Sequence, residues 1–447
     1  MLTNMTEGKI SRHLISYSIP LVLGNLFQLT YNAVDSIIVG RFIGKEALAA
    51  VGTAAPVMDI IVLGISGICI GASVLMSNFF GAGKEDMVKN EMATTAMFGL
   101  YFSLIVVALG MLITTPLLRL LSVPEEILGI TATYLRIIFI GAPFTFFYNA
   151  IASALKSVGD SRTPLKFLMF CSILNGLLDV ILIGFLGFGI ICSALTTVFA
   201  EALSAILCIL YVYRKIPLLQ LKPSQFRIDR KLLKETLQFG AVTALQQSIQ
   251  PIAKLLIQGA INPMGVDVIA TFNAVQKVEA YACLPEQSIS TGITTFVAQN
   301  AGAGKEQRIR QGFRTGMLLE FGYWVFLCAA VLLLRQPIMT LFVGSGNRSI
   351  IDLGSNYLKI MAFFLLYPGF TNGMQGYYRG RKCMKMTLLG TLIQTSLRTA
   401  FVYILTPSMG LNGVAYACAI GWSAMLLVEV PYYFYYNRKH ASASTRG

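Results

Sequence analysis

The sequence predicts an all-α polytopic membrane protein with twelve transmembrane helices, and three observations lead to this class. Hydrophobic residues make up 55% of the 447 residues and charged residues only 13%, whereas a soluble domain carries roughly 25% charge. The mean hydropathy is +0.67. Apolar stretches of about 20 residues, the length of a helix that crosses a bilayer, recur along the chain. We expect spans at 14–40, 48–77, 92–115, 130–155, 164–185, 189–213, 236–260, 267–298, 313–336, 354–376, 386–406 and 410–436.

Short polar segments separate these spans. Gly-Ala-Gly-Lys-Glu follows the second span from Gly81 and the eighth span from Gly302, which predicts a tight turn. It does not match a phosphate-binding loop, because that motif needs Ser or Thr after its Lys and a wider glycine spacing. We therefore expect no nucleotide site. The last span ends in a tyrosine cluster followed by Arg438 and Lys439, which is typical of an interfacial aromatic belt and its basic anchor.

The chain consists of two related halves. The Gly-Ala-Gly-Lys-Glu segments lie 221 residues apart, and the same offset relates Gly44 to Gly265 and Gly189 to Gly410. A unit of six spans returns to the same side of the membrane, so the two copies are parallel repeats. We expect an N-terminal six-helix lobe at 1–213, a basic cytoplasmic linker at 214–235 and a C-terminal six-helix lobe at 236–447.

Charge sets the orientation of the spans. The two ends and the loops on their side contain 25 Lys and Arg, and the opposite loops contain 5. Cytoplasmic loops are the basic ones, so both termini are expected in the cytoplasm of a plasma (inner) membrane protein. The net charge of +14 is then a topology signal, and nucleic acid is not an expected partner. The eight cysteines form no CxxC motif and only two histidines occur, which argues against disulfides and a metal centre.

Polar residues inside the spans mark the candidate site. Asp35 follows Gln28 and Asn32 along one stripe of the first span, and Asn175 and Asp179 share a face of the fifth. Thr196 and Thr197 of the sixth span lie at comparable depth. Such groups can converge on an oxygen-rich pocket that coordinates Na⁺, or in which two carboxyl groups hold one proton. The alternative is that they tie helices together by hydrogen bonds.

The repeat suggests that this ion site is single. At the offset of 221, apolar or weakly polar residues replace the acidic and amide groups in the second half. A purely structural role would be about equally useful in both halves. The replacements are Leu256 for Asp35, Ser396 for Asn175, Ala400 for Asp179 and Cys418 for Thr197.

The second half has its own polar set. Gln250 and Lys254 lie one turn apart on the seventh span, and the eighth carries Lys277 and Glu279. These residues either line a central cavity or form an interhelical ion pair in which Lys254 or Lys277 neutralises Glu279. The residues that we expect to line a substrate cavity are Gln28, Asn32, Asn149, Gln250, Lys254, Asn273, Gln276 and Glu279.

The chain resembles bacterial transporters of the multidrug and toxic compound extrusion (MATE) family. The resemblance rests on the two six-span halves, on Pro20 with Asp35, on both Gly-Ala-Gly-Lys turns, on the Gly159–Pro164 loop, and on Asn175 with Asp179. It implies a V-shaped two-lobe bundle and antiport of drugs against Na⁺ or H⁺. It also implies a cation site made by Asp35, Asn175, Asp179 and Thr197. Some relatives have carboxylates in the seventh and tenth spans, where this chain has Gln246, Gln247 and no acid.

The expected function is a secondary active multidrug exporter that antiports amphipathic or cationic organic compounds against H⁺ or Na⁺. The alternatives are a lipid-linked-sugar flippase of the same superfamily, or a membrane-embedded enzyme or receptor. An enzyme is not expected, because no His, Cys or Ser/Lys constellation is found near one membrane face. We expect a monomer in the lipid bilayer that binds small organic substrates and has no cofactor apart from its coupling ion.

Overall fold

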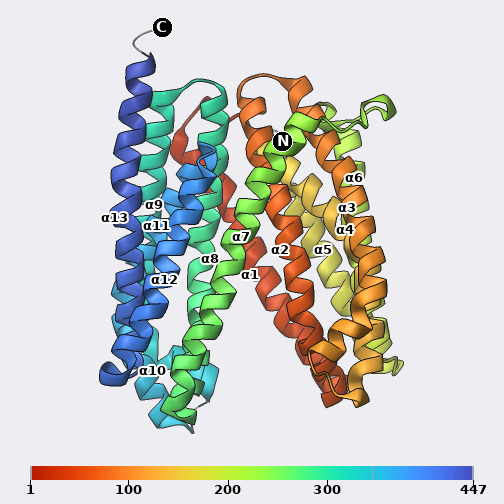
Figure 1. Cartoon of the computed structure of the whole chain (residues 1–447), viewed down its shortest axis with the longest axis vertical. Coiled ribbons are helices and arrows are strands. Elements are labelled where there is room, and N and C mark those ends of the chain that lie inside the picture. The colour runs from red at the N-terminus through yellow and green to blue at the C-terminus, as the bar shows by residue number, and fades with distance from the viewer. Residues whose placement is uncertain (1–2, 345, 445–447) are drawn as a thin grey trace. The chain divides into compact units, whose positions relative to one another are not determined.

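The computed structural model describes residues 3–344 and 346–444, and these residues form helices and connecting turns without a β-strand. Figure 1 shows the helices in chain order. They are α1 (Ile10–Phe42), α2 (Lys45–Gly81), α3 (Glu85–Leu120), α4 (Glu125–Ser157), α5 (Arg162–Asp179), α6 (Ile190–Lys215), α7 (Arg230–Ile261), α8 (Val266–Gly302), α9 (Glu306–Val343), α10 (Arg348–Phe364), α11 (Leu366–Gly380), α12 (Met384–Met409) and α13 (Leu411–Ser444).

The helices confirm the predicted all-α membrane architecture. Among the described residues, eight helices are long and apolar enough to cross a membrane, and a ninth span is obtained if α10 and α11 are taken together. The remaining long helices, α1, α7 and α8, have 33, 32 and 37 residues. These three helices carry the polar stripes recognised in the sequence, which explains their lower hydropathy.

The tenth span is broken rather than continuous, which corrects the prediction of one helix over 354–376. α10 and α11 meet at an angle of 43°. The break lies at Leu365, three residues before Pro368. A proline cannot donate the backbone hydrogen bond that would continue the helix through this point.

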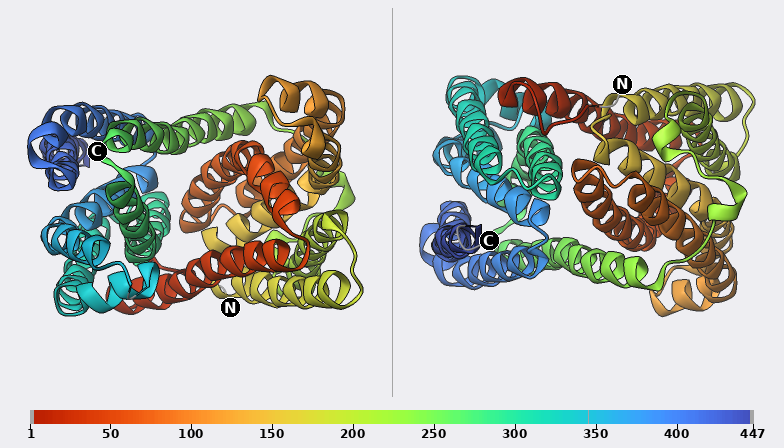
Figure 2. Two further views of the ribbon diagram at one scale, coloured as in Figure 1. Left: turned by 90° about the horizontal axis from the view of Figure 1, so that it is seen from below. Right: turned by 90° about the horizontal axis from the view of Figure 1, so that it is seen from above.

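The chain divides into two compact units. The first unit comprises the chain up to Thr6, Ile19–Ala244 and Gly302–Gly304, and the second comprises Glu7–Ser18, Leu245–Ala301 and the chain from Lys305 onward. The division falls inside α7, whereas the sequence predicts a boundary in the linker at 214–235. Within the first unit, α4 packs against α2, α3 and α6, and within the second unit α12 and α13 lie side by side (Figures 1 and 2).

The Gly-Ala-Gly-Lys segments are tight turns, as predicted. Gly83 and Gly304 both have φ of 69°, a left-handed conformation that glycine adopts without steric cost. The amide of Lys84 donates to the Phe79 carbonyl at 3.0 Å, and that of Lys305 donates to the Asn300 carbonyl at 2.9 Å. These amides close their own turns and do not form an open phosphate cradle.

Left-handed residues also fix the register of the repeat. Gly44 and Gly265, like Gly83 and Gly304, are left-handed and lie 221 residues apart. Later in each half the left-handed pairs are Gly159 with Lys382 and Gly187 with Gly410, which lie 223 residues apart. The second half therefore contains two extra residues between Gly304 and Lys382, and the single offset of 221 is wrong for the last two spans.

The corrected register changes the counterparts of the fifth span. Asn175 corresponds to Arg398 and Asp179 to Val402, instead of Ser396 and Ala400. All four residues of the corrected pairs are buried, whereas Ser396 and Ala400 are exposed. Thr197 likewise corresponds to Ile420. The second half still lacks counterparts of the two carboxylates, so the argument for a single ion site of this kind is unchanged.

The linker packs as part of the first unit. Ile216, Leu218 and Leu219 are buried in an apolar cluster with residues of α2, α3, α4 and α6. Next to this cluster lies a cavity of about 140 Å³ with an almost entirely apolar lining, to which Leu219 and Leu221 contribute. The Tyr213 hydroxyl donates to the Leu221 carbonyl at 2.8 Å and holds this part of the linker against α6.

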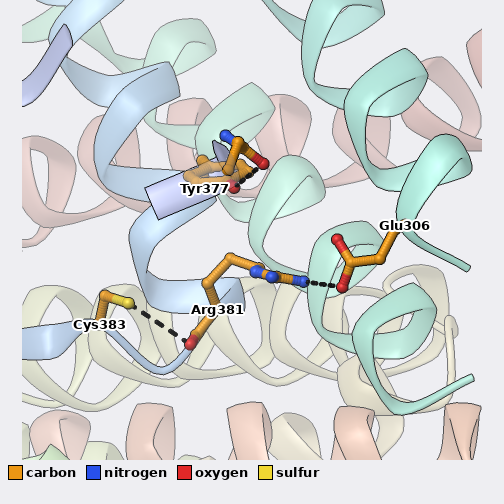
Figure 3. A network of polar contacts seen from close by, with 5 residues as sticks. Glu306, Tyr377, Arg381 and Cys383 are labelled. Atoms are coloured by element: carbon orange, nitrogen blue, oxygen red, sulfur yellow. Dashed lines mark hydrogen bonds and ion pairs between the residues drawn. The ribbon is translucent and has the colours of Figure 1, made fainter. Parts of the chain in front are cut away.

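A buried ion pair joins the start of α9 to the end of α11 in the second unit (Figure 3). Arg381 Nη1 lies 2.7 Å from Glu306 Oε1, and only 5% of the Arg381 side chain is exposed. Burial alone would lower the pKa of Arg381, but the hydrogen bond to Glu306 outweighs it and the pKa is raised. The guanidinium also lies 5.0 Å from the centre of the Tyr436 ring.

Candidate functional site

Three helices of the first unit bring the predicted cation ligands together. Asp35 comes from α1, and Asn175 and Asp179 lie one turn apart on the buried face of α5. Asp179 is 0% and Asn175 1% exposed. The carboxyl groups of Asp35 and Asp179 are hydrogen-bond neighbours. The structure thus places the two acidic groups at one point in the interior of the first unit.

Local backbone structure helps to define this point. Asp179 is the last residue of α5, and a π-helical turn, Val180–Phe185, follows it directly. Such turns widen a helix and often occur at functional sites. The buried face of α5 includes Cys171, Asn175 and Asp179 at intervals of four residues, so the helical period alone carries the polar groups inward.

The sixth span contributes Thr196, not the Thr197 that the resemblance implies. Thr196 Oγ1 donates to Asp179 Oδ1 at 2.5 Å. The carbonyls of Cys192 and Ser193 lie 3.0 and 2.9 Å from the same hydroxyl. Thr197 points to the next face of α6 and is half-buried. The hydroxyl that contacts Asp179 is therefore one position earlier than expected.

Several polar atoms in this cluster have unused hydrogen-bonding capacity. In the described part of the chain, Asp35 Oδ1, Asp179 Oδ2 and both side-chain atoms of Asn175 have no hydrogen-bond partner. Buried polar groups are rarely left unpaired, because each lost hydrogen bond costs about 1–3 kcal/mol. Three of the four atoms are oxygens, the ligand type that hard cations prefer. The donor set fits a bound proton or Na⁺.

Residues that the sequence analysis did not assign surround the carboxyl pair. Tyr31 of α1 and Tyr134 of α4 interact electrostatically with both Asp35 and Asp179. Glu201 of α6 belongs to the same neighbourhood and accepts a hydrogen bond of 2.6 Å from Thr145. Tyr31 precedes Asp35 by one helical turn, a signal that could have identified it, whereas Tyr134 lies on another helix and gave none.

The polar residues predicted to line a cavity fall into two separate groups. In the first unit, Gln28 and Asn32 are exposed on α1 and Asn149 is half-buried on α4. Asn149 donates to the Thr145 carbonyl of its own helix at 2.8 Å. The structure therefore does not bring these three residues to the carboxyl pair.

The second group lies in the second unit. Glu279 of α8 is half-buried, and the charges nearest to it are Arg398 of α12 and Lys254 of α7, with Tyr357 as a hydrogen-bond neighbour. Gln250 of α7 donates to Gln394 of α12 at 3.3 Å. Asn273 is exposed, Gln276 is half-buried and Lys277 is exposed. Lys254 and the previously unassigned Arg398, rather than Lys277, are the cations near Glu279.

Among the described residues, no group of three His, Cys, Asp or Glu side chains is arranged to hold a metal ion. The free cysteines are spread over both units, and five of them are fully buried in helices.

Comparison with known proteins places the chain among transporters. The MatE family model matches residues 20–181 and again 243–404, one match in each half, with the two matches 223 residues apart. The chain is 26% identical over 437 residues to the probable multidrug resistance protein YpnP of Bacillus subtilis, covering 97% of this chain and 96% of that protein. It is 24% identical to the probable multidrug resistance protein NorM of Thermotoga maritima, covering 91% and 88%.

The fold agrees with that of solved transporters. One is an outward-facing multidrug resistance MATE family transporter of the MOP superfamily, which aligns with a TM-score of 0.88 at 22% identity and with 98% of each chain covered. Together with the repeated family match, this confirms the predicted two-repeat helical architecture.

Proposed function

Because the chain belongs to the MatE family of multidrug and toxic compound extrusion transporters, we propose that it is a secondary active exporter of amphipathic, cationic organic compounds in exchange for H⁺ or Na⁺. The buried Asp35–Asp179 pair is the observation that carries this proposal. The names of its relatives support multidrug export as the general activity. Membrane-spanning helices and family membership make it a multi-pass membrane protein that acts on small molecules.

The coupling ion binds at Asp35 and Asp179, with Asn175 and Thr196 as neighbours. Two carboxylates in contact inside a low-dielectric interior repel each other strongly, so the pair requires a proton or a monovalent cation between them. Loss of this cation leaves net negative charge in the first unit, which favours a different conformation. Each positive charge that moves inward across the membrane supplies about 2.3 kcal/mol for every 100 mV of membrane potential.

Substrate competes with the coupling ion through the conformations that each favours. A ligand shifts an equilibrium only by its differential affinity for the two states. Export then requires that the cation-bound form bind substrate less well than the cation-free form. No cofactor takes part, and the chain works as a monomer in the plasma membrane.

Asp35→Asn tests the proposal. We expect the variant to insert and fold but to lose efflux of ethidium driven by an imposed pH or Na⁺ gradient in membrane vesicles. Asp59→Asn is the matched control, since Asp59 is an acidic residue of α2 that is exposed and lies outside the cluster. Wild-type efflux in a well-expressed Asp35→Asn variant, or equal losses in both variants, would refute the assignment.

We also propose that both termini and the linker at 214–235 face the cytoplasm. The distribution of 25 and 5 basic residues between the two sets of loops supports this orientation. Ser224 is exposed on the linker and is a suitable position for Ser224→Cys in a background without reactive cysteines. Labelling by an impermeant thiol reagent should require permeabilised cells, and labelling in intact cells would contradict the orientation.

A further inference from the structure

A second pair of carboxyl groups lies in the interior of the second unit. Glu286 of α8 is 0% exposed and Glu320 of α9 is 1% exposed. In the described part of the chain, none of their four carboxylate oxygens has a well-formed hydrogen bond. A buried carboxylate without a partner is costly, and inside a membrane span it usually has a function.

The two carboxyl groups face the same point on a third helix. Glu320 Oε2 and Glu286 Oε1 would lie 3.6 and 3.9 Å from a Cβ atom placed on Gly369 of α11. Because residue 369 is glycine, no side chain separates the two groups. The space is too tightly enclosed to suggest a large ligand, but a proton between the two carboxyl groups needs no additional volume.

The groups around the pair include no basic side chain that would neutralise it. Asn372 of α11 is the polar neighbour of Glu286, and Cys283 of α8 and Tyr323 of α9 are the nearby titratable groups. The Tyr323 hydroxyl donates to the Ala282 carbonyl at 2.8 Å. Lys254 and Glu279 act on Cys283, and within the described residues neither Glu286 nor Glu320 forms an ion pair.

The first unit solves the same packing problem without acidic groups. In the register given by the left-handed residues, Ile65 of α2 corresponds to Glu286, Gly99 of α3 to Glu320 and Phe146 of α4 to Gly369. Ile65 and Phe146 belong to one buried apolar cluster. A Cβ on Gly99 would lie 1.8 Å from the Phe146 ring, so the ring fills the space above this glycine.

The same three-helix contact thus has two alternative contents, one apolar and one with two carboxyl groups. Since the apolar version packs in the first unit, the fold does not require acidic residues there. Their presence in the second unit needs a separate reason.

We propose that Glu286 and Glu320 form a second proton-binding site, in which the two carboxyl groups hold one proton between them. One carboxyl group donates its O–H to the carboxylate of the other, and this satisfies two of the orphaned oxygens. The site goes beyond the exchange of a cation at Asp35 and Asp179, and it does not depend on that pair.

Infrared spectroscopy of the purified protein in detergent tests the site, because a protonated carboxyl group has its own C=O band whether or not reagents can reach it. The difference between wild type and Glu286→Gln/Glu320→Gln should contain the band of one protonated carboxyl group at neutral pH. On raising the pH, this band should persist about one pH unit further in wild type than in either single Gln variant. Replacing one carboxylate by a neutral amide donor removes the repulsion that holds the last proton and stabilises the remaining carboxylate.

Two further variants separate the possible results. Glu286→Ile/Glu320→Gly/Gly369→Phe transfers the apolar residues of the first unit and should remain folded without the band. Asp35→Asn should retain the band, so that failure of the proposed exporter mechanism and failure of this site can be distinguished. The proposal is overturned if the difference band is absent at neutral pH, or if its midpoint is the same in wild type and the single Gln variants.

Discussion

Replacing Thr196 with valine should change how tightly the first unit holds its proton. Thr196 Oγ1 donates to Asp179 Oδ1 at 2.5 Å, and Asp179 is fully buried. Valine has nearly the same shape but no hydroxyl group, so the variant removes this donor with little change in packing. The ionised form of Asp179 loses more than the protonated form, and the variant should hold its proton more tightly.

The size of this effect follows from the geometry of the hydroxyl group. When Asp179 is protonated, Thr196 can accept its O–H and turn its own hydrogen to the carbonyl of Cys192 or Ser193, at 3.0 and 2.9 Å. Only the difference between a charged and a neutral hydrogen bond is then lost. Charged bonds contribute about 1.5–3 kcal/mol and neutral ones about 0.5–1.5 kcal/mol, a difference that corresponds to roughly one pH unit.

The assay is proton release from purified protein in weak buffer on addition of substrate, measured over a range of pH. The midpoint should rise by about one pH unit in Thr196→Val. Thr197→Val is the matched control, because Thr197 lies on the next face of α6, and its midpoint should not move. If Thr197→Val moves the midpoint and Thr196→Val does not, the assignment of Thr196 is wrong.

Three further predictions concern stability, measured by thermal unfolding in detergent. Gly67→Ala should destabilise the protein by about 1–3 kcal/mol, because its Cβ would lie 2.7 Å from the Gly240 carbonyl of α7, whereas Gly64→Ala should be tolerated because nothing lies within 4 Å; equal effects would disprove the close helix contact. Arg381→Gln should cost about 1–3 kcal/mol, since it leaves a largely buried pairing site unmatched, while Arg119→Gln, from a pair with both side chains mostly exposed, should cost at most about 1 kcal/mol; a smaller loss for Arg381→Gln than for Arg119→Gln would contradict this. Leu219→Ala should cost about 2–5 kcal/mol, because Leu219 is fully buried in the linker, and Lys222→Ala should be neutral; an unchanged unfolding temperature in Leu219→Ala would show that the linker does not contribute to the core.

Hydropathy and the positions of basic residues predict most of the fold, because both reflect the transfer of whole helices into lipid. Local breaks are harder to predict. The bend between α10 and α11 depends on where Pro368 falls within an apolar run, and the apolar composition is the same on either side of it. The repeat register was misjudged for a similar reason, since two inserted residues leave the hydrophobic pattern of the later spans intact.

The candidate site was predictable where ligands share a helix. Asn175 and Asp179 are separated by four residues, and this spacing alone places them on one face of α5. The choice between Thr196 and Thr197 depends on the rotation of α6 about its axis, which the sequence does not specify when both neighbours are threonine. Glu286 and Glu320 lie on different helices, and their proximity depends on Gly369 of a third helix, so no spacing in the sequence could indicate it.

The buried linker restricts how this transporter can be tagged. A fluorescent reporter inserted between the lobes is often assumed to hang from a passive tether, but Ile216–Leu221 is anchored by the side chains that it places in the first unit. An insertion there would extract these side chains and leave the cavity beside α3 and α6 open to water. Lys222, Pro223 and Ser224 are exposed, and a reporter inserted after Ser224 leaves the apolar anchor in place. A reporter at that position remains close to α7, so its signal would follow the movement of that helix.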